Sequence, residues 1–188
     1  MTLATKLATV AFGTLFAGTA FAAQHAMENP MVGGAEMSAE KTIVENASAS
    51  ADHTTLVAAV QAAGLVETLS GEGPFTVFAP TNAAFEALPA GTVDTLLMEE
   101  NKDQLTQILT CHVVAADVMS EALAGMIEAD GGTHPVPTVG GCTLQAQMDG
   151  ENITLTDENG NVATVTIADV DQSNGVVHVI DTVLLPAA

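Results

Sequence analysis

Cysteine and histidine stand next to each other at Cys111-His112, and these are the residue types that thiol hydrolases use as nucleophile and general base. The apolar residues that follow predict a strand over Cys111–Ala115. Neighbouring side chains on a strand point to opposite faces, so this pair is not expected to act as a catalytic dyad. A buried His112 that hydrogen-bonds to the backbone is the preferred interpretation.

A second histidine, His178, lies three residues before Asp181 and raises the possibility of a serine hydrolase. In a regular strand, however, Asp181 faces away from His178, and the chain has no G-x-S-x-G nucleophile motif. We expect Asp181 to accept hydrogen bonds from the backbone or from threonines at the end of the strand. The sequence therefore predicts no catalytic residue.

Metal and cofactor motifs are also missing from the sequence. The five histidines show neither H-x₃-H nor C-x₂-C spacing, and there is no glycine-rich phosphate loop. Asp157-Glu158-Asn159-Gly160 lacks the remaining ligands of a calcium loop and is explained by an Asn-Gly turn. No metal and no cofactor is expected. The histidines are His25, His53, His112, His134 and His178.

The charge of the chain restricts its partners. The 188 residues include 23 acidic and 3 basic ones, and the net charge is −20. Such a chain repels nucleic acid and anionic lipid, so neither is an expected partner. The acidic residues are scattered, which favours a role in solubility, while attraction of cations or of a basic partner stays open.

The N-terminus has the pattern of a secretory signal peptide over residues 1–23. Lys6 precedes an apolar run from Leu7 to Phe21, which is too short to span a bilayer, and small residues surround the expected cleavage site. We expect a periplasmic, secreted or cell-surface protein without membrane insertion. In that oxidising environment Cys111 and Cys142 can form a disulfide; two buried thiols are the alternative.

Residues 24–40 are expected to form an extended lead-in to one domain over residues 41–186. Methionines and His25 in this segment suit Cu(I), but no Met-x-Met or His-x-His cluster is present, so a tether is the preferred interpretation. The methionines are Met27, Met31 and Met37.

Helices are predicted for the first half of the domain. Asp52 is a candidate cap for a helix that ends at Gly64, and Asn101 with Gln104 is a candidate capping box for a second helix. The inward residues of the first are Leu56, Ala59, Val60 and Ala63, and those of the second are Leu105, Ile108 and Leu109.

Strands are predicted after Thr110, with a short helix near Asp117–Met126. The strands are separated by turn signals at Gly140-Gly141, Asp149-Gly150, Asn159-Gly160 and Asn174-Gly175. The last strand, within Gly175–Pro186, is apolar on both faces, which indicates a central position. Helices followed by antiparallel strands predict an α+β class.

Beyond the signal peptide, all aromatic side chains lie within the stretch Gly73–Phe85. Pro80 ends the predicted strand, and Thr81 or Asn82 can cap a helix that turns Phe85 inward. We interpret this stretch as a buried joint between a strand and a helix. A ligand platform is less consistent with the composition, because such platforms commonly use exposed Trp or Tyr and this chain has neither.

Three segments, "GPFTVFAPTNAAFEALPAGTVDTLL", "ILTCHVV" and "SNGVVHVIDTVLLP", together resemble the fasciclin domain from Lys41 to Pro186. The resemblance implies a wedge of twisted, mostly antiparallel β-structure with several short helices. It also implies a secreted or surface module for adhesion, without characteristic catalysis. The family's central Tyr-His pair falls on Cys111-His112, so the chain departs from the pattern at the first position, and that pair marks only a possible interaction region.

The sequence thus predicts an exported, monomeric and non-catalytic interaction module. We expect it to bind an unidentified protein or surface glycoconjugate. The alternative is a small periplasmic ligand carrier or hydrolase that uses His112, Asp181 and the Phe75–Phe85 joint.

Overall fold

Helices occupy mainly the first half of the chain and strands the second, in agreement with the change of apolar period. The computed structural model describes residues 29–89 and 91–187. Its helices are α1 (Ile43–Ala49), α2 (Thr54–Ala63), α3 (Val66–Leu69), α4 (Asn82–Glu86), α5 (Thr92–Leu96), α6 (Lys102–Thr110) and α7 (Ser120–Ala129), with 3₁₀ turns at Ala51–His53 and Glu99–Asn101. Its strands are β1 (Met31–Val32), β2 (Ala35–Glu36), β3 (Phe75–Pro80), β4 (Val113–Val114), β5 (Thr133–Pro137), β6 (Thr143–Asp149), β7 (Asn152–Thr156), β8 (Val162–Gln172) and β9 (Gly175–Ile180). The α+β prediction is confirmed.

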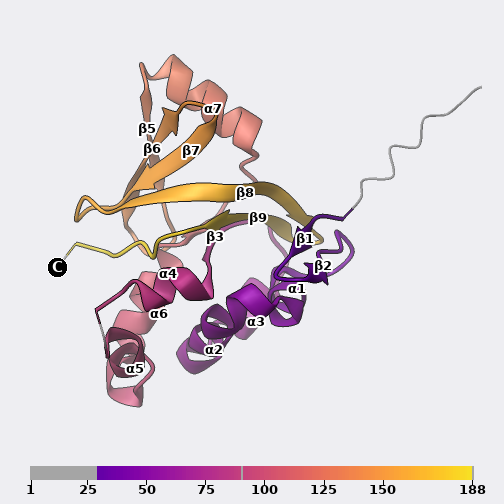
Figure 1. The fold of residues 1–188 in the computed structure, drawn as a ribbon, viewed down its shortest axis with the longest axis vertical. Coiled ribbons are helices and arrows are strands. Elements are labelled where there is room, and N and C mark those ends of the chain that lie inside the picture. The colour runs from indigo at the N-terminus through magenta and orange to yellow at the C-terminus, as the bar shows by residue number, and fades with distance from the viewer. Residues whose placement is uncertain (1–28, 90, 188) are drawn as a thin grey trace, which may run out of the picture.

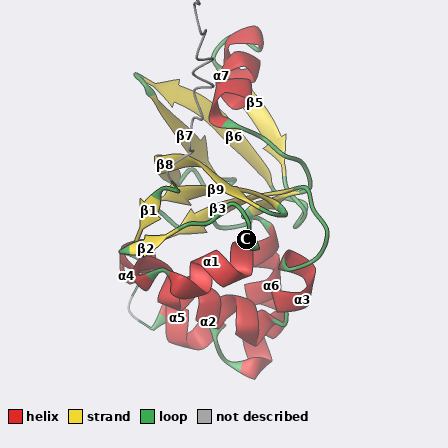
Figure 2. Cartoon of the chain, turned by 90° about the vertical axis from the view of Figure 1, so that its right-hand side faces the viewer, coloured by secondary structure: helices red, strands yellow, loops and turns green. Residues whose placement is uncertain are grey.

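The main sheet separates the helices into two groups. Figures 1 and 2 show α1 to α6 gathered on one side and α7 alone at the opposite end, against β5 and β6. Within the described residues, seven strands form this sheet in the order β4-β3-β9-β8-β7-β6-β5. In this part of the chain every pairing is antiparallel except β3 with β9. The wedge of mostly antiparallel β-structure is therefore present.

The predicted turns connect the strands as expected. Gly140-Gly141, Gly150, Asn159-Gly160 and Asn174-Gly175 join consecutive strands from β5 to β9. Strand β9 lies between β3 and β8, which confirms its central position. It ends at Ile180, six residues before Pro186, so Pro186 does not terminate it.

Helix α2 buries the four predicted residues and ends at Gly64, whose φ of 74° is the left-handed conformation that glycine adopts without strain. The predicted cap at Asp52 is wrong. Ser50 caps the preceding 3₁₀ turn instead, because its hydroxyl accepts the Asp52 N–H at 3.3 Å.

Helix α6 also buries its predicted residues, but the predicted capping box does not form. The Asn101 side chain donates to the Thr95 carbonyl at 2.7 Å, and the 3₁₀ turn before the helix takes the place of a side-chain cap.

The predicted strand over Cys111–Ala115 is too long. Cys111 ends helix α6, since its N–H donates to the Gln107 and Ile108 carbonyls at 3.0 and 3.1 Å. His112 continues this turn, and only Val113–Val114 pair as a strand. Helical hydrogen bonding therefore extends into the apolar run, and Cys111 and His112 do not occupy opposite faces of a strand.

The joint between β3 and α4 forms as predicted. The Thr81 hydroxyl accepts the Ala84 N–H at 3.4 Å, and Phe85 is 7% exposed. The three rings do not share one core, however. Phe78 lies in the apolar cluster with α7, whereas Phe85 and the half-buried Phe75 belong to the cluster with the other helices. Strand β3 therefore contributes to two cores, one on each face.

Residues 29–40, within the proposed lead-in, form a packed hairpin. Strand β1 pairs with β2, and the Met37 N–H donates to the Pro30 carbonyl at 2.9 Å. Val32 and Met37 are buried against Val170 and Val179 of the main sheet. Residues 1–23, where we expect a signal peptide, lie outside the described residues, as do His25 and Met27. Among the helices that are described, none is long and apolar enough to cross a membrane.

Candidate functional site

His112 is enclosed in the framework between α6 and the C-terminal segment. Its side chain is 2% exposed, and Nδ1 lies 2.8 Å from the Ile108 carbonyl of the preceding turn. Nε2 accepts the Leu184 N–H at 3.0 Å. These partners require the neutral tautomer with the proton on Nδ1, so both ring nitrogens are already committed within the protein.

Burial lowers the pKa of His112 from 6.5 to about 4; the Ile108 carbonyl and the charge of Asp157 oppose this shift without reversing it. At neutral pH the imidazole is uncharged. Protonation at Nε2 would place an N–H against the Leu184 N–H and break that hydrogen bond. This environment therefore supports a structural histidine better than a general base.

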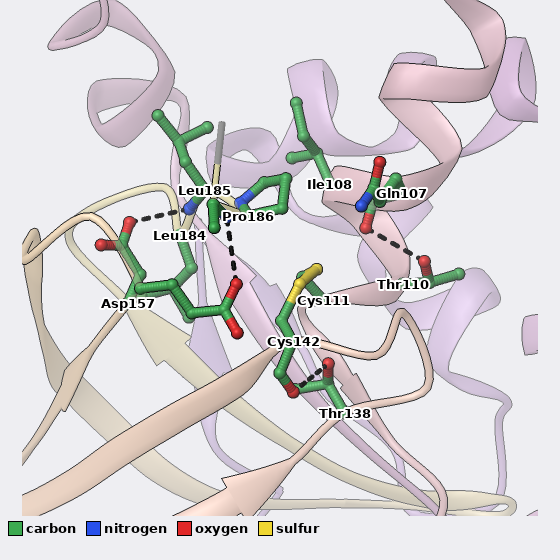
Figure 3. Close-up of a disulfide and its surroundings, with 12 residues drawn as sticks. Gln107, Ile108, Thr110, Cys111, Thr138, Cys142, Asp157, Leu184, Leu185 and Pro186 are labelled. Carbon is green, nitrogen blue, oxygen red and sulfur yellow. Dashed lines mark hydrogen bonds between the residues drawn. A yellow bond between two sulfur atoms is a disulfide. The ribbon is translucent and has the colours of Figure 1, made fainter.

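Figure 3 shows Cys111 joined to Cys142 by a disulfide, with the two Cα atoms 5.4 Å apart. Both residues are buried. The loop before Cys142 is also held by the backbone, because the Gly140 N–H donates to the Thr110 carbonyl at 3.0 Å. A Cβ at Gly140 would lie 2.7 Å from the Cys111 nitrogen, so glycine is needed for this close approach.

Asp157 fixes the C-terminal segment from the other side. One carboxylate oxygen accepts the Asn159 and Asn161 N–H groups, at 2.9 and 2.8 Å. The second accepts the Leu185 N–H at 2.9 Å, a contact drawn in Figure 3. The sequence predicted only a turn at Asp157. Its side chain also anchors the residues that follow β9.

His178 is buried and has backbone partners on both ring nitrogens. Nε2 lies 2.8 Å from the Val118 carbonyl, and Nδ1 accepts the Asp169 N–H at 3.2 Å. Burial lowers the pKa of His178, while the Val118 carbonyl opposes that shift. Ser120 hydrogen-bonds to the Asp169 carboxylate and not to the imidazole, so these residues do not form a catalytic triad.

Asp181 plays the part expected for it at the end of the sheet. Its carboxylate accepts the Thr164 N–H at 2.8 Å and the Thr182 hydroxyl at 3.1 Å. It is exposed, whereas His112 and His178 are buried. The structure thus does not bring Asp181 and the two histidines together as converging polar groups.

Asp169 is the residue that sequence reasoning missed. Its φ of 55° is the left-handed conformation, at a register shift between Ile167 and Val170 of β8. This irregularity aims its carboxylate at the Ser120 N–H, 2.6 Å away, at the start of α7. Asp169 carries no clear sequence signal, because β8 also contains threonines and a second aspartate, and aspartate in a strand is equally compatible with exposure.

The enclosed cavities of the described residues are small and apolar. One of about 30 Å³ lies among α1, α2 and α3 and reaches His112; a second of about 30 Å³ lies beneath the N-terminal hairpin beside His53. Each has room for about one water molecule. Neither could hold a substrate with converging polar groups.

Larger hollows are open to solvent. A depression of about 520 Å³ lies along residues 70–74 and 171–176, and another of about 450 Å³ lies between α6 and the C-terminal segment. Across residues 29–89 and 91–187, no group of three or more His, Cys, Asp or Glu side chains is placed to hold a metal ion. His112, Asp157 and His178 thus hydrogen-bond mainly to the backbone, and the larger hollows are open to solvent.

Comparison with a family model and with known proteins points to one family. The fasciclin domain model matches residues 51–186. Protein sll1483 of Synechocystis is 48% identical over 164 residues, covering 85% of this chain and 81% of that protein. Immunogenic protein MPB70 of Mycobacterium bovis is 36% identical over 177 residues, covering 88% and 80%.

Two further matches cover only part of the other protein's length. Transforming growth factor-beta-induced protein ig-h3 of Sus scrofa is 40% identical over 133 residues, covering 71% of this chain and 17% of that protein. The solved FAS1 domain pair from the insect cell adhesion molecule fasciclin I aligns with a TM-score of 0.69 at 17% identity, over 77% of this chain and 51% of that one. The match to the fasciclin family model over residues 51–186, together with the shared fold, places this chain in the fasciclin domain family.

Proposed function

We propose that this protein is an exported, non-catalytic adhesion or protein-interaction module that binds a surface or extracellular macromolecule. It acts through complementarity of a rigid outer surface. Within this proposal residues 1–23 are a removed signal peptide, residues 24–40 a lead-in, and residues 41–186 a monomeric domain in the periplasm or at the cell surface.

The observation that carries the proposal is the use of His112 and His178, two of the three buried histidines; the third, His53, is enclosed beside a small apolar cavity. His112 and His178 each have both ring nitrogens engaged with backbone groups. A general base needs a free nitrogen within reach of a substrate proton, and neither ring offers one in this arrangement. The apolar cavities of about 30 Å³ are too small for a ligand and the larger hollows are open to solvent, which also argues against a ligand carrier.

Relatives support a surface role. One similar structure belongs to an insect cell adhesion molecule, and a mycobacterial relative of 34% identity over 172 residues is named a cell surface glycolipoprotein. These names describe those proteins, and we extend them to this chain as a proposal. Cys111 and His112 are not part of the proposed contact surface, because both are buried.

The test is a pull-down from cell-surface extracts with the oxidised protein that lacks residues 1–23. An unrelated protein of similar net charge serves as the control for nonspecific attraction of basic proteins. Retention of a defined partner at physiological salt, beyond that control, is the expected result. Equal retention by both proteins, or turnover of a substrate by the purified domain, would contradict the proposal.

A further inference from the structure

Within residues 29–89 and 91–187, no helix packs over one face of the sheet formed by β5, β6, β7 and β8. Side chains on the other face, such as Leu144, Leu155 and Val165, are buried in the core beneath α7. Because side chains alternate along a strand, the residues between them point outward. Figures 1 and 2 show α7 on one side of these strands, and none of the other described helices lies across the opposite side.

Two rows of side chains cross the four strands in register on this face. Thr133, Gln147, Thr154 and Thr164 are successive partners in one row. Each is exposed or half-buried. Neighbouring strands lie about 4.8 Å apart, so the row presents one hydroxyl or amide group at each strand interval.

In each strand, the residue of the second row lies two positions from the residue of the first row. The second row consists of Pro135, Gln145, Thr156 and Val162, again successive partners. We call the two rows together the threonine–glutamine face. None of the eight side chains is charged, although the chain carries 23 acidic residues and a net charge of −20.

Acidic residues border this face. Asp149 follows Gln147 at the end of β6, Glu158 accepts the Thr143 N–H at 3.2 Å, and Asp181 accepts the Thr164 N–H at 2.8 Å. A polyanion would be repelled by this border, and a polycation would bind the border carboxylates and not the uncharged rows between them. Charge therefore selects a neutral occupant for the centre.

The composition of the face also distinguishes among neutral occupants. Protein interfaces use a buried apolar centre with aromatic, Met or Arg anchors, and the two rows contain none of these residues. Their hydroxyl and amide groups both donate and accept hydrogen bonds, as sugar hydroxyls do. A repeating polymer can engage a regular row many times, which compensates for weak single contacts.

Resting on the function proposed above, we infer that the threonine–glutamine face binds a neutral, hydroxyl-rich polysaccharide. Without aromatic stacking each sugar contributes little, so binding depends on polymer length. Short oligosaccharides are expected to bind far more weakly than the polymer.

The experiment is sedimentation of the oxidised protein with insoluble neutral polysaccharides: cellulose, a β-1,3-glucan and granular starch. The variant Gln145→Glu with Gln147→Glu places two carboxylates on the face with little change of shape. Its control, Gln61→Glu with Gln104→Glu, adds the same charge at exposed positions on α2 and α6. Thermal unfolding of all three proteins checks that each is folded.

Wild type and control should sediment with at least one of these polymers, and the face variant should bind about tenfold more weakly, since its carboxylates would lose solvation against a neutral chain. Free short oligosaccharides should compete poorly. Wild type remaining in solution with all three polymers would overturn the inference, as would equal binding by the folded face variant. Capture of a surface protein in the pull-down, together with no polysaccharide binding, would preserve the proposed function and reject this face.

Discussion

Nε2 of His112 accepts the Leu184 backbone N–H at 3.0 Å, which joins residues 72 positions apart in the chain. Through this bond the end of α6 holds the segment that follows β9. The same segment is held by Asp157 through the Leu185 N–H. His112 and Asp157 are residue types that also occur in active sites, but here they stabilise the irregular segment that follows β9.

The burial of His112 makes stability depend on pH. Because the pKa of His112 is about 4 in the folded protein and near 6.5 otherwise, the unfolded chain binds more protons between these values. The contribution of His112 to the free energy of unfolding is complete above about pH 6.5 and is lost as the pH falls toward 4. It is on the order of 3 kcal/mol in total. Burial lowers the pKa values of His53 and His178 as well, with the same sign.

Denaturant unfolding of wild type and His112→Asn across this pH range isolates the effect from the titration of the carboxylates. The stability advantage of wild type should shrink as the pH falls. Leu109→Ala, which removes a buried apolar side chain of α6 and no titrating group, is the control, and its cost should not change with pH. An advantage that is constant from pH 6.5 to pH 4 would contradict the assignment.

The disulfide gives a second prediction. Cys111 and Cys142 are separated by 31 residues, and closing such a loop stabilises a protein by about 3 to 4 kcal/mol in the chain-entropy model. Cys111→Ser with Cys142→Ser should lose a large part of that stability. Denatured, unreduced protein should show no free thiol, and two titratable thiols would end the assignment.

The aromatic joint predicts an order of effects. Phe85 is 7% exposed inside the helical core, whereas Phe75 is half-buried. Phe85→Ala should cost about 3 to 5 kcal/mol, and Phe75→Ala should cost less. Equal, small losses in urea unfolding would instead favour an exposed platform of rings.

The N-terminal hairpin provides a fourth prediction. Met37 is buried against Val170 and Val179, so Met37→Ala should destabilise the domain by about 2 kcal/mol or more. Met31→Ala is the matched control, since that side chain is exposed and should have little effect. If Met31→Ala abolished Cu(I) uptake without loss of stability, the metal alternative would regain support.

Local patterns predicted much of this fold from the sequence. The glycine stop after α2, the β3-to-α4 joint and the four strand turns follow from backbone chemistry that acts within a few residues. Local patterns failed where distant contacts decide. Cys111 lies at the end of α6 and is joined to Cys142, 31 residues away, and Met37 is buried only because the hairpin meets β8 and β9.

The candidate site was less predictable for the same reason. His112 was recognised as a buried residue with backbone partners, but its bond to Leu184 depends on the path of the C-terminal segment. Asp169 was not recognised, because its contact with Ser120 requires an irregularity within β8. Such contacts between residues far apart in the chain leave no periodic signal.

The most direct test of the central claim is partner binding by His112→Asn. The claim is that His112 supports the fold while function resides on the outer surface. Below its melting temperature, the folded variant should retain the pull-down partner as wild type does, although its melting temperature is reduced. An unchanged melting temperature together with lost binding would contradict the account, because His112 would then act directly in function.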